Sequence, residues 1–292
     1  LQEDGTSVEG RLPAPGGLGI RRLALERALE HVAREAGVEL REHCQVLGLE
    51  RGPECARLTL AGGEQVEARL VVAADGLASP LRQAQGLDRA VSPRAPRRFG
   101  LRQHFRMAPW SPLVEVHFAR GVEAYVTPAG AERVGVAFLW EDGALQGRVG
   151  FAELLHHFPV LGARLEGVPS DSTPRGAGPL LRRVRARALD RFVLVGDAAG
   201  YVDAITGEGL TLAFRSAAEL GRRLPEVLAQ GATRESLAAY ERAVRPHHRR
   251  YVFFTRMLLT LARRPGLRAR VLRQLARHPA LFEALLQRVI GP

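Results

Sequence analysis

The stretch GDAAGYVDAITGEGLTLA, residues 196–213, decides the fold of this 292-residue chain. It follows Phe192-Val193-Leu194-Val195, a continuously apolar run of the kind found in strands buried on both faces. Apolar positions then recur at helical period from about residue 207 to residue 224. The pattern predicts a buried strand that delivers Asp197 at its carboxyl end, a glycine-rich turn and a helix, and it favours an α/β fold.

These residues suit a ligand that carries a polyol chain and a heteroaromatic ring. Ligands of α/β sheets bind beyond the carboxyl ends of the strands, where the Asp197 carboxylate could accept hydrogen bonds from hydroxyl groups. The N–H groups of a helix start form an anion site, so Gly207–Leu210 could stabilise negative charge on the ring. In the alternative interpretation the glycines only make a tight turn. The combination of acid, spacing and helix favours the binding site.

The residues before this stretch predict a helix and several strands. Apolar side chains at helical spacing predict a helix over 21–36, which Gly37 closes because a left-handed residue is needed there. Strands are predicted at 38–49, 56–60, 65–69 and 70–74, and the last of these ends at Asp75-Gly76. From about 98 to 140 the apolar residues alternate with polar ones, which predicts an antiparallel sheet with two distinct faces.

Proline and glycine punctuate the remaining segments. A short helix is predicted at 151–158, followed by an irregular segment to about 180. The helix that begins near Gly207 should end before Pro225. Residues 233–292 predict amphipathic helices that are broken at Pro246, at Pro265-Gly266 and at Pro279.

Three stretches, in order along the chain, resemble the fingerprints of one flavoprotein family. GDAAGYVDAITGEGLTLA is similar to the second FAD fingerprint of aromatic hydroxylases and geranylgeranyl reductases, although the family usually has proline where this chain has Ala204. VVAADGLASPLR, residues 71–82, resembles the middle fingerprint, and GIRRLALERALEHVAREAGVEL, residues 19–40, resembles the helix whose first arginine touches the cofactor. The resemblance implies FAD contacts at Arg22, Val46, Asp75, Gly76, Gly196, Asp197, Gly207, Gly209 and Leu210.

The resemblance also implies a domain organisation. A Rossmann-like FAD-binding domain would comprise 1–90 and 179–225, with an inserted antiparallel substrate-binding sheet at 91–178 and a C-terminal helical cap at 226–292. The family begins with a strand, a G-x-G-x-x-G turn and a helix. Gly16-Gly17-Leu18-Gly19 lacks that spacing. We therefore expect that the N-terminal βαβ unit is missing from this sequence and that the chain alone cannot hold FAD tightly.

The implied activity is an FAD-dependent oxidoreduction with NAD(P)H as the reductant. Hydroxylation of a small hydrophobic or aromatic metabolite by a monooxygenase is the first expectation, because the middle fingerprint is present. Reduction of an isoprenoid double bond, halogenation, and an inactive fragment are the alternatives. His104, Tyr125 and Thr127 lie in the predicted sheet where the family's substrate residues are found, although packing within the sheet would explain them about as well.

Charge and cysteine content bear on partners and location. All 42 basic residues are arginine, and residues 222–292 hold 15 arginines and four glutamates, which accounts for the whole net charge of +11. No nucleic-acid motif accompanies them, so we expect no nucleic-acid partner; a solvated helical surface and peripheral contact with a membrane are the alternatives. Cys44 and Cys55 are too few for a disulfide scaffold, which favours a reduced, cytoplasmic protein.

Two pairs of adjacent histidines do not predict a metal site. His156-His157 and His247-His248 are each consecutive, and neighbours on a helix diverge by about 100°. Neither pair can chelate one ion together, so we assign no metal and expect both pairs at the surface. The oligomeric state stays open.

Overall fold

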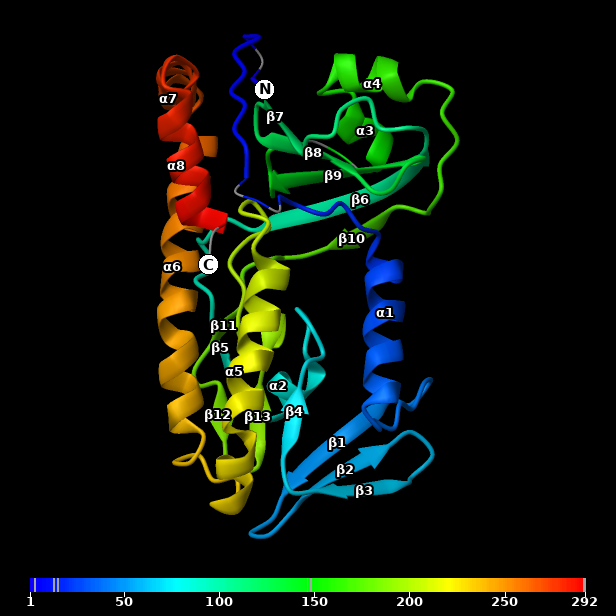
Figure 1. The fold of residues 1–292 in the computed structure, drawn as a ribbon, viewed down its shortest axis with the longest axis vertical. Coiled ribbons are helices and arrows are strands. Elements are labelled where there is room, and N and C mark those ends of the chain that lie inside the picture. Colours follow the sequence, from blue (N-terminus) through cyan, green and yellow to red (C-terminus); the bar gives the residue numbers. More distant parts are fainter. Residues whose placement is uncertain (3, 13, 15, 146, 148, 291–292) are drawn as a thin grey trace. The chain divides into compact units, whose positions relative to one another are not determined.

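The computed structural model describes the whole chain except residues 3, 13, 15, 146, 148 and 291–292, and it leaves the side chains of residues 289 and 290 undescribed (Figure 1). The chain forms two compact units, each assembled from segments that are distant in the sequence. Unit 1 contains Leu1–Leu40, Pro96–Pro179 and Arg256–Pro292, and unit 2 contains Arg41–Ala95 and Leu180–Thr255.

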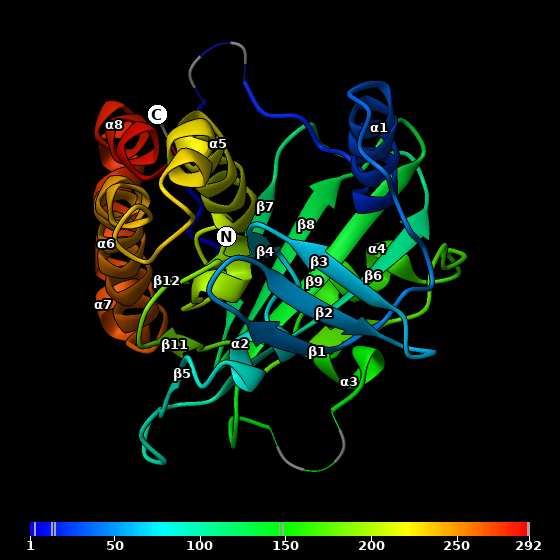
Figure 2. The same ribbon diagram turned by 90° about the horizontal axis from the view of Figure 1, so that it is seen from below.

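Unit 1 is built on a five-stranded antiparallel sheet with the strand order β10-β6-β9-β8-β7. Figure 2 shows its long strands side by side. The strands are β6 (Arg98–Arg106), β7 (Glu115–Ala119), β8 (Val122–Pro128), β9 (Arg133–Glu141) and β10 (Arg175–Ala177). The antiparallel sheet predicted over 98–140 is confirmed, and β10 extends it with a segment that the sequence presents as irregular.

Two short helices cover the apolar face of this sheet. They are α3 (Phe151–Leu155) and α4 (Pro159–Leu165), and α4 lies in the segment predicted to be irregular. The core between sheet and helices is aromatic at its centre. The ring of Phe138 is fully buried, with its centroid 5.0 Å from that of Phe151 and 5.7 Å from that of Phe158. Large aromatic surfaces of this kind dominate the stability of a small core.

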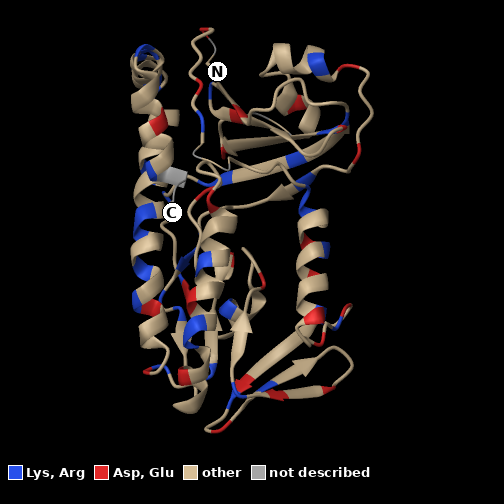
Figure 3. Ribbon diagram, in the orientation of Figure 1, with Lys and Arg blue, Asp and Glu red and all other residues tan. Residues whose placement is uncertain are grey.

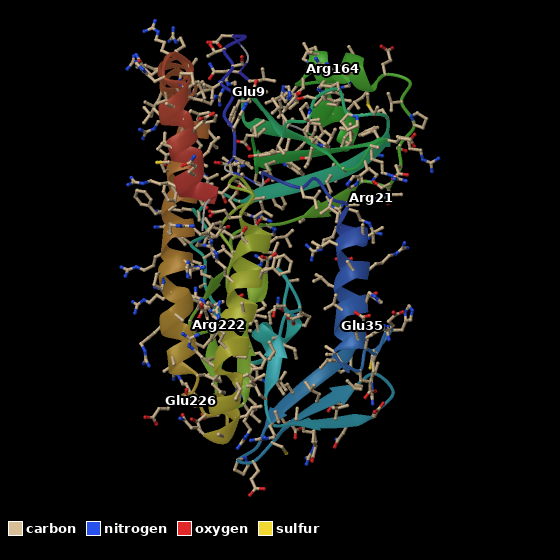
Figure 4. All side chains as sticks on the ribbon, viewed as in Figure 1. Glu9, Arg21, Glu35, Arg164, Arg222 and Glu226 are labelled. Atoms are coloured by element: carbon tan, nitrogen blue, oxygen red, sulfur yellow. The ribbon has the colours of Figure 1, made fainter. Side chains whose placement is uncertain are left out.

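The N-terminal part of unit 1 is tied to the sheet by charge. Helix α1 (Arg22–Glu35) confirms the predicted helix, but none of its side chains is buried. Arg21, labelled in Figure 4 at the start of α1, forms a 2.8 Å ion pair with Asp171. Arg106 and Arg133 also pair with this buried carboxylate. Their hydrogen bonds, that of Arg133 first, lower the pKa of Asp171, so the cluster stays charged at neutral pH.

Unit 2 contains two three-stranded sheets and a short two-stranded one. The first sheet has the order β12-β13-β4, in which β13 pairs in parallel with β4. The second is the antiparallel sheet β1-β2-β3, and β11 pairs with β5. The strands are β1 (Val46–Arg51), β2 (Ala56–Leu60), β3 (Gln65–Ala68), β4 (Val71–Ala73), β5 (Asp88–Arg89), β11 (Arg183–Val184), β12 (Ala188–Leu189) and β13 (Phe192–Leu194). The strand predicted at 38–49 is wrong in its first half, because β1 begins only at Val46.

The helices of unit 2 run past two prolines that the sequence presents as breaks. Helix α5 (Gly209–Ala229) continues through Pro225, and α6 (Ala238–Ala262) continues through Pro246. Both predicted breaks are wrong. Packing outweighs the lost hydrogen bonds, because Val227 beyond the first proline and Tyr251 beyond the second are almost completely buried.

The C-terminal helices carry the excess of arginine. After α6, which starts in unit 2 and ends in unit 1, come α7 (Pro265–Arg277) and α8 (Pro279–Ile290). Their first residues confirm the predicted breaks at Pro265 and Pro279, and proline suits the first position of a helix. Figure 3 shows arginines repeating along α6. Among the described residues, no helix combines the length and apolar character needed to cross a membrane.

We predict that Phe138→Ala lowers the free energy of unfolding of unit 1 by about 3–5 kcal/mol, because the cavity at the centre of the aromatic core cannot collapse completely. Both tryptophans, Trp110 and Trp140, belong to unit 1. Urea unfolding followed by tryptophan fluorescence therefore measures this unit.

The matched control is Val160→Ala on α4, whose side chain is 69% exposed. Its expected effect is within about 0.5 kcal/mol. Equal effects of the two substitutions would contradict the assignment of Phe138 to the core.

Candidate functional site

The site begins at one edge of the parallel strand pair in unit 2. Leu194 of β13 lies opposite Ala73 of β4, and the N–H of Val195 donates to the carbonyl of Ala73 at 3.1 Å. Parallel strands end at the same edge of a sheet. The structure therefore brings Asp75-Gly76, which follows β4, to the same edge as Gly196-Asp197, which follows β13.

The turn after β13 is a single 3₁₀ turn, Gly196–Ala199, pressed against α5. Gly196 has φ 57°, which a residue with a side chain rarely adopts. A Cβ atom at this position would lie 3.3 Å from the Cβ of Ala213 on α5. The N–H of Gly196 donates to the Ser216 hydroxyl at 3.1 Å. Glycine is therefore required at position 196 both by the backbone angle and by the close approach of the helix.

Helix α5 begins beside the Asp197 carboxylate. A Cβ atom added to Gly209 would lie 3.9 Å from Oδ1 of Asp197, so the first residue of the helix adjoins this oxygen. The N-cap residue, Glu208, gives no side-chain hydrogen bond to the first turn, and the first turn contains no acidic residue. The first turn of this 21-residue helix, where the positive end of the helix dipole lies, thus contains no negative side chain.

Glu208 itself is buried without full hydrogen bonding. Its side chain is 5% exposed, and its Oε2 atom has no hydrogen-bond partner among the described residues. Burial raises the pKa of this carboxyl, which the charges of Arg250 and Arg215 partly offset. An orphaned polar atom at a helix start is costly unless a further group binds there.

The loop between the turn and the helix is held by a tyrosine from α6. The Tyr251 hydroxyl accepts hydrogen bonds from the N–H groups of Val202 and Asp203 and donates to the Asp203 carbonyl at 2.7 Å. Burial raises the pKa of Tyr251 to about 12, so it remains a donor at neutral pH. These contacts fix the loop that contains Ala204, where the resembling family usually has proline.

Asp75 organises its own turn. Its Oδ1 accepts a 2.6 Å hydrogen bond from the Ser79 hydroxyl, and its Oδ2 accepts one from the N–H of Leu81 at 3.1 Å. Asp75 therefore supports the start of the short helix α2 (Pro80–Ala84). Gly76 has φ 78° and allows the chain to turn out of the strand end.

Arg82 connects the two strand-end loops, a role that the sequence did not assign to it. Its side chain is completely buried and pairs with Asp88 at 2.7 Å. The same guanidinium donates to the carbonyl of Ala198 at 3.2 Å, and to the carbonyls of Leu77 and Ala78. The only signal in the sequence is the arginine that ends the stretch VVAADGLASPLR.

Two of the predicted cofactor residues belong to elements other than the two strand-end loops. Arg22 belongs to unit 1, where its exposed guanidinium pairs with Glu26 at 2.7 Å. Val46 is half-buried at the start of β1. Leu49, three residues further along that strand, joins the apolar core that β4 and β13 share. The roles of Arg22 and Val46 stay predictions.

The three predicted substrate residues share one face of the sheet in unit 1. His104 of β6 and Thr127 of β8 both lie opposite Gly135 of β9, and Tyr125 is two residues from Thr127 on the same strand. Side chains in one cross-strand row, or two apart on one strand, point to the same side. Burial, with the charges of Arg102 and Arg21, lowers the pKa of His104, so its imidazole is neutral at pH 7. The structure gathers these side chains on the face opposite to α3 and α4.

The prediction that His247-His248 lies at the surface is wrong. Both side chains are half-buried and line a pocket between the Gly196–Ala199 turn, α5 and α6.

We predict that Arg82→Ala lowers the free energy of unfolding by about 1–3 kcal/mol, because the substitution leaves the buried carbonyl oxygen of Ala198 without its donor and removes the ion pair with Asp88. Urea unfolding followed by far-ultraviolet circular dichroism measures the change. Arg89→Ala is the control, since Arg89 is exposed on β5 and should change the stability by less than about 0.5 kcal/mol. A similar loss in both variants would contradict the bridging role of Arg82.

Comparison with known proteins gives the family. The model of the FAD dependent oxidoreductase (DAO) family matches residues 3–223. Dialkyldecalin synthase of Streptomyces rugosporus is 30% identical over 208 residues, which cover 68% of this chain and 44% of the synthase. The Diels-Alderase PyrE3 of pyrroindomycin biosynthesis is 26% identical, with a TM-score of 0.70 over 92% of this chain and 59% of that protein.

A third similar protein shows the fold. The flavoprotein/dehydrogenase of Cytophaga hutchinsonii aligns with a TM-score of 0.83 over 100% of this chain and 75% of that protein, at 18% identity. The chain spans less than half the length of the Streptomyces synthase. Because the family model covers about three quarters of its residues, including both strand-end loops, the chain belongs to the FAD-dependent oxidoreductase family.

Proposed function

We propose that the edge of unit 2 that carries Asp197 binds the ribityl chain and ring of FAD, and that the whole protein is an NAD(P)H-consuming monooxygenase of a small hydrophobic or aromatic metabolite. One observation carries the proposal. The Asp197 carboxylate lies beside the start of α5, where the helix dipole has no negative side chain in its first turn.

The residues present fit this cofactor. Asp197 offers acceptor oxygens to the hydroxyl groups of a ribityl chain. Nothing described lies within 4 Å of a Cβ built on Gly207, and Leu210 at the helix start is 39% exposed, so a planar ring can approach the first turn. The orphaned Oε2 of Glu208 is a further polar atom at the same helix start.

The chain's own groups would stabilise and orient the cofactor. When bound, FAD would supply the redox chemistry, with NAD(P)H as the reductant and dioxygen as the oxidant. The N–H groups at the start of α5 favour a negative charge close to the first turn. Tyr251 keeps the intervening loop in one conformation, and Arg82 keeps the two strand-end loops together. Preorganised dipoles of this kind need no rearrangement during the reaction.

The choice of a monooxygenase rests on the middle fingerprint. Asp75-Gly76 lies at the same sheet edge as Gly196-Asp197, and the resemblance connects that pair with the approach of the pyridine nucleotide. His104, Tyr125 and Thr127 share one face of the unit 1 sheet and are the proposed substrate contacts. The neutral imidazole of His104 would accept a proton from a bound hydroxyl group.

A second candidate is a cyclase that forms carbon–carbon bonds. It is favoured by the identities of 30% and 26% to a dialkyldecalin synthase and to a Diels-Alderase. In such a protein a flavin held at Asp197 would shape the pocket without changing its redox state during the reaction. The two candidates therefore share the cofactor site and differ in the use of NAD(P)H.

We predict that Asp197→Ala weakens FAD binding about ten- to a hundredfold. A hydrogen bond to a charged acceptor contributes about 1.5–3 kcal/mol, and 1.4 kcal/mol corresponds to a factor of ten. FAD titration of the protein expressed from the whole reading frame that contains this chain, followed by the absorption spectrum, measures the effect. Asp142→Ala is the control, because Asp142 is exposed in unit 1 and pairs only with Arg97 among the described charges. Unchanged FAD affinity in Asp197→Ala would refute the assignment.

We further predict that NAD(P)H bleaches the oxidised-flavin band of that protein without oxygen, and that the band returns when oxygen is admitted. A flavin that stays oxidised in the presence of both NADH and NADPH would exclude the monooxygenase and favour the cyclase. Product analysis then separates hydroxylated, reduced and halogenated products from one another.

A further inference from the structure

Unit 2 contains a pocket that extends beyond the proposed flavin site, although Gly196 and Asp197 belong to both. It lies between the Gly196–Ala199 turn, α5 and α6, and both views show these two helices side by side within the unit (Figures 1 and 2). Helix α5 contributes Leu212 and Ser216. Successive residues of a helix are turned by about 100°, so these side chains lie on the other side of α5 from the exposed Phe214.

An arginine in this pocket has no counter-charge bound to it. The half-buried Arg187, which immediately precedes β12, lines the pocket. Within the part of the chain that the structure describes, its guanidinium makes no hydrogen bond and no ion pair. Burial lowers the pKa of Arg187, Arg245 lowers it further, and Tyr240 and Glu241 act in the opposite direction. The Glu241 carboxylate is committed to the backbone N–H of Arg187 at 2.7 Å.

The unpaired guanidinium is the informative feature. Arginine stays protonated in proteins, so it cannot escape the cost of burial by losing its charge. Because Arg187 is half-buried, its charge loses part of its hydration without gaining a partner, and a bound anion would supply that partner.

The other polar groups of the pocket suit the same kind of ligand. Arg215 lines it from α5 and adds a second guanidinium, while Asp197 is the acidic residue in the lining. Burial, followed by the charge of Arg187, lowers the pKa of His248 to about 4. This imidazole is therefore neutral at pH 7 and can donate one hydrogen bond. The Tyr240 hydroxyl also lines the pocket, and its proton is committed to the carbonyl of Leu194 at 2.9 Å.

We propose that this pocket is an anion site, in which the Arg187 guanidinium binds a phosphate or carboxylate group with help from Arg215 and His248. The planar fork of arginine matches two oxygens of such a group. The proposal does not rest on the proposed flavin function, because an anion could bind to Arg187 without a cofactor, although the pocket shares Gly196 and Asp197 with the proposed flavin site.

Calorimetric titration of the chain at pH 7 and constant ionic strength tests the proposal, with inorganic phosphate in one arm and acetate in the other. We expect saturable one-site binding that Arg187→Gln weakens at least tenfold. Arg242→Gln should leave the affinity within twofold, because Arg242 is an exposed residue of α6 outside the pocket. Tighter binding of phosphate would identify a phosphate group as the ligand, and tighter binding of acetate a carboxylate.

A second measurement uses the unsubstituted chain and does not depend on the folding of a variant. The His248 resonance, assigned by comparison with His248→Phe, reports the titration of the imidazole by nuclear magnetic resonance. A bound anion stabilises the imidazolium form, so phosphate should raise the midpoint from about 4. Absence of saturable binding in both arms, an unchanged midpoint, or full binding by a folded Arg187→Gln variant would each overturn the proposal.

Discussion

The parallel pairing of β4 with β13 is the constraint on which the site depends. Each strand has only three residues, yet their register sets where both following loops start. A shift by one residue would turn every side chain of the strand to the other face of the sheet. It would also move Asp75 along the edge relative to Asp197. Phe192 and Leu194 resist such a shift, because both are fully buried in the pairing that the structure shows.

Side chains from outside the two strands hold the loops that follow them in place. Arg82 comes from α2 and bonds to loop carbonyls on both sides, so neither loop can move without breaking buried hydrogen bonds. Tyr251 comes from the middle of α6 and holds the loop that leads to α5. The loop is thereby rigid without a proline at Ala204. The continuation of α6 through Pro246 has a local consequence, because it carries Tyr251 to this position.

The sequence predicted correctly those helices and strands whose formation depends on residues close to one another in the chain. The helix at 22–35, the strand at 56–60, the antiparallel sheet and the strand-turn-helix around Asp197 follow from periodicity and from glycine positions. The ends of α5 and α6 were mispredicted, because both helices continue through a proline, at Pro225 and Pro246. Their continuation depends on packing against parts of the chain that are distant in the sequence. Arg82 could not be assigned for the same reason, since its partner Ala198 comes from the distant turn after β13. His248 was expected at the surface, whereas the structure places it half-buried in a pocket with the distant Gly196–Ala199 turn.

Unit 2 is assembled from two segments that are distant in the sequence, and this affects how it folds during synthesis. About 120 residues separate β4 from β13, so a ribosome that adds about 5–20 residues per second completes β4 several seconds before its partner exists. During that time the nascent strand Val71–Ala73 presents unpaired backbone groups and an apolar surface, the condition that invites association between chains. Unit 2 can close only after residues 192–194 have left the ribosome. The folding rate of unit 2 is therefore limited by the pairing of strands that are distant in the sequence. The yield of folded protein should depend on how well the early strands are protected from other chains during translation.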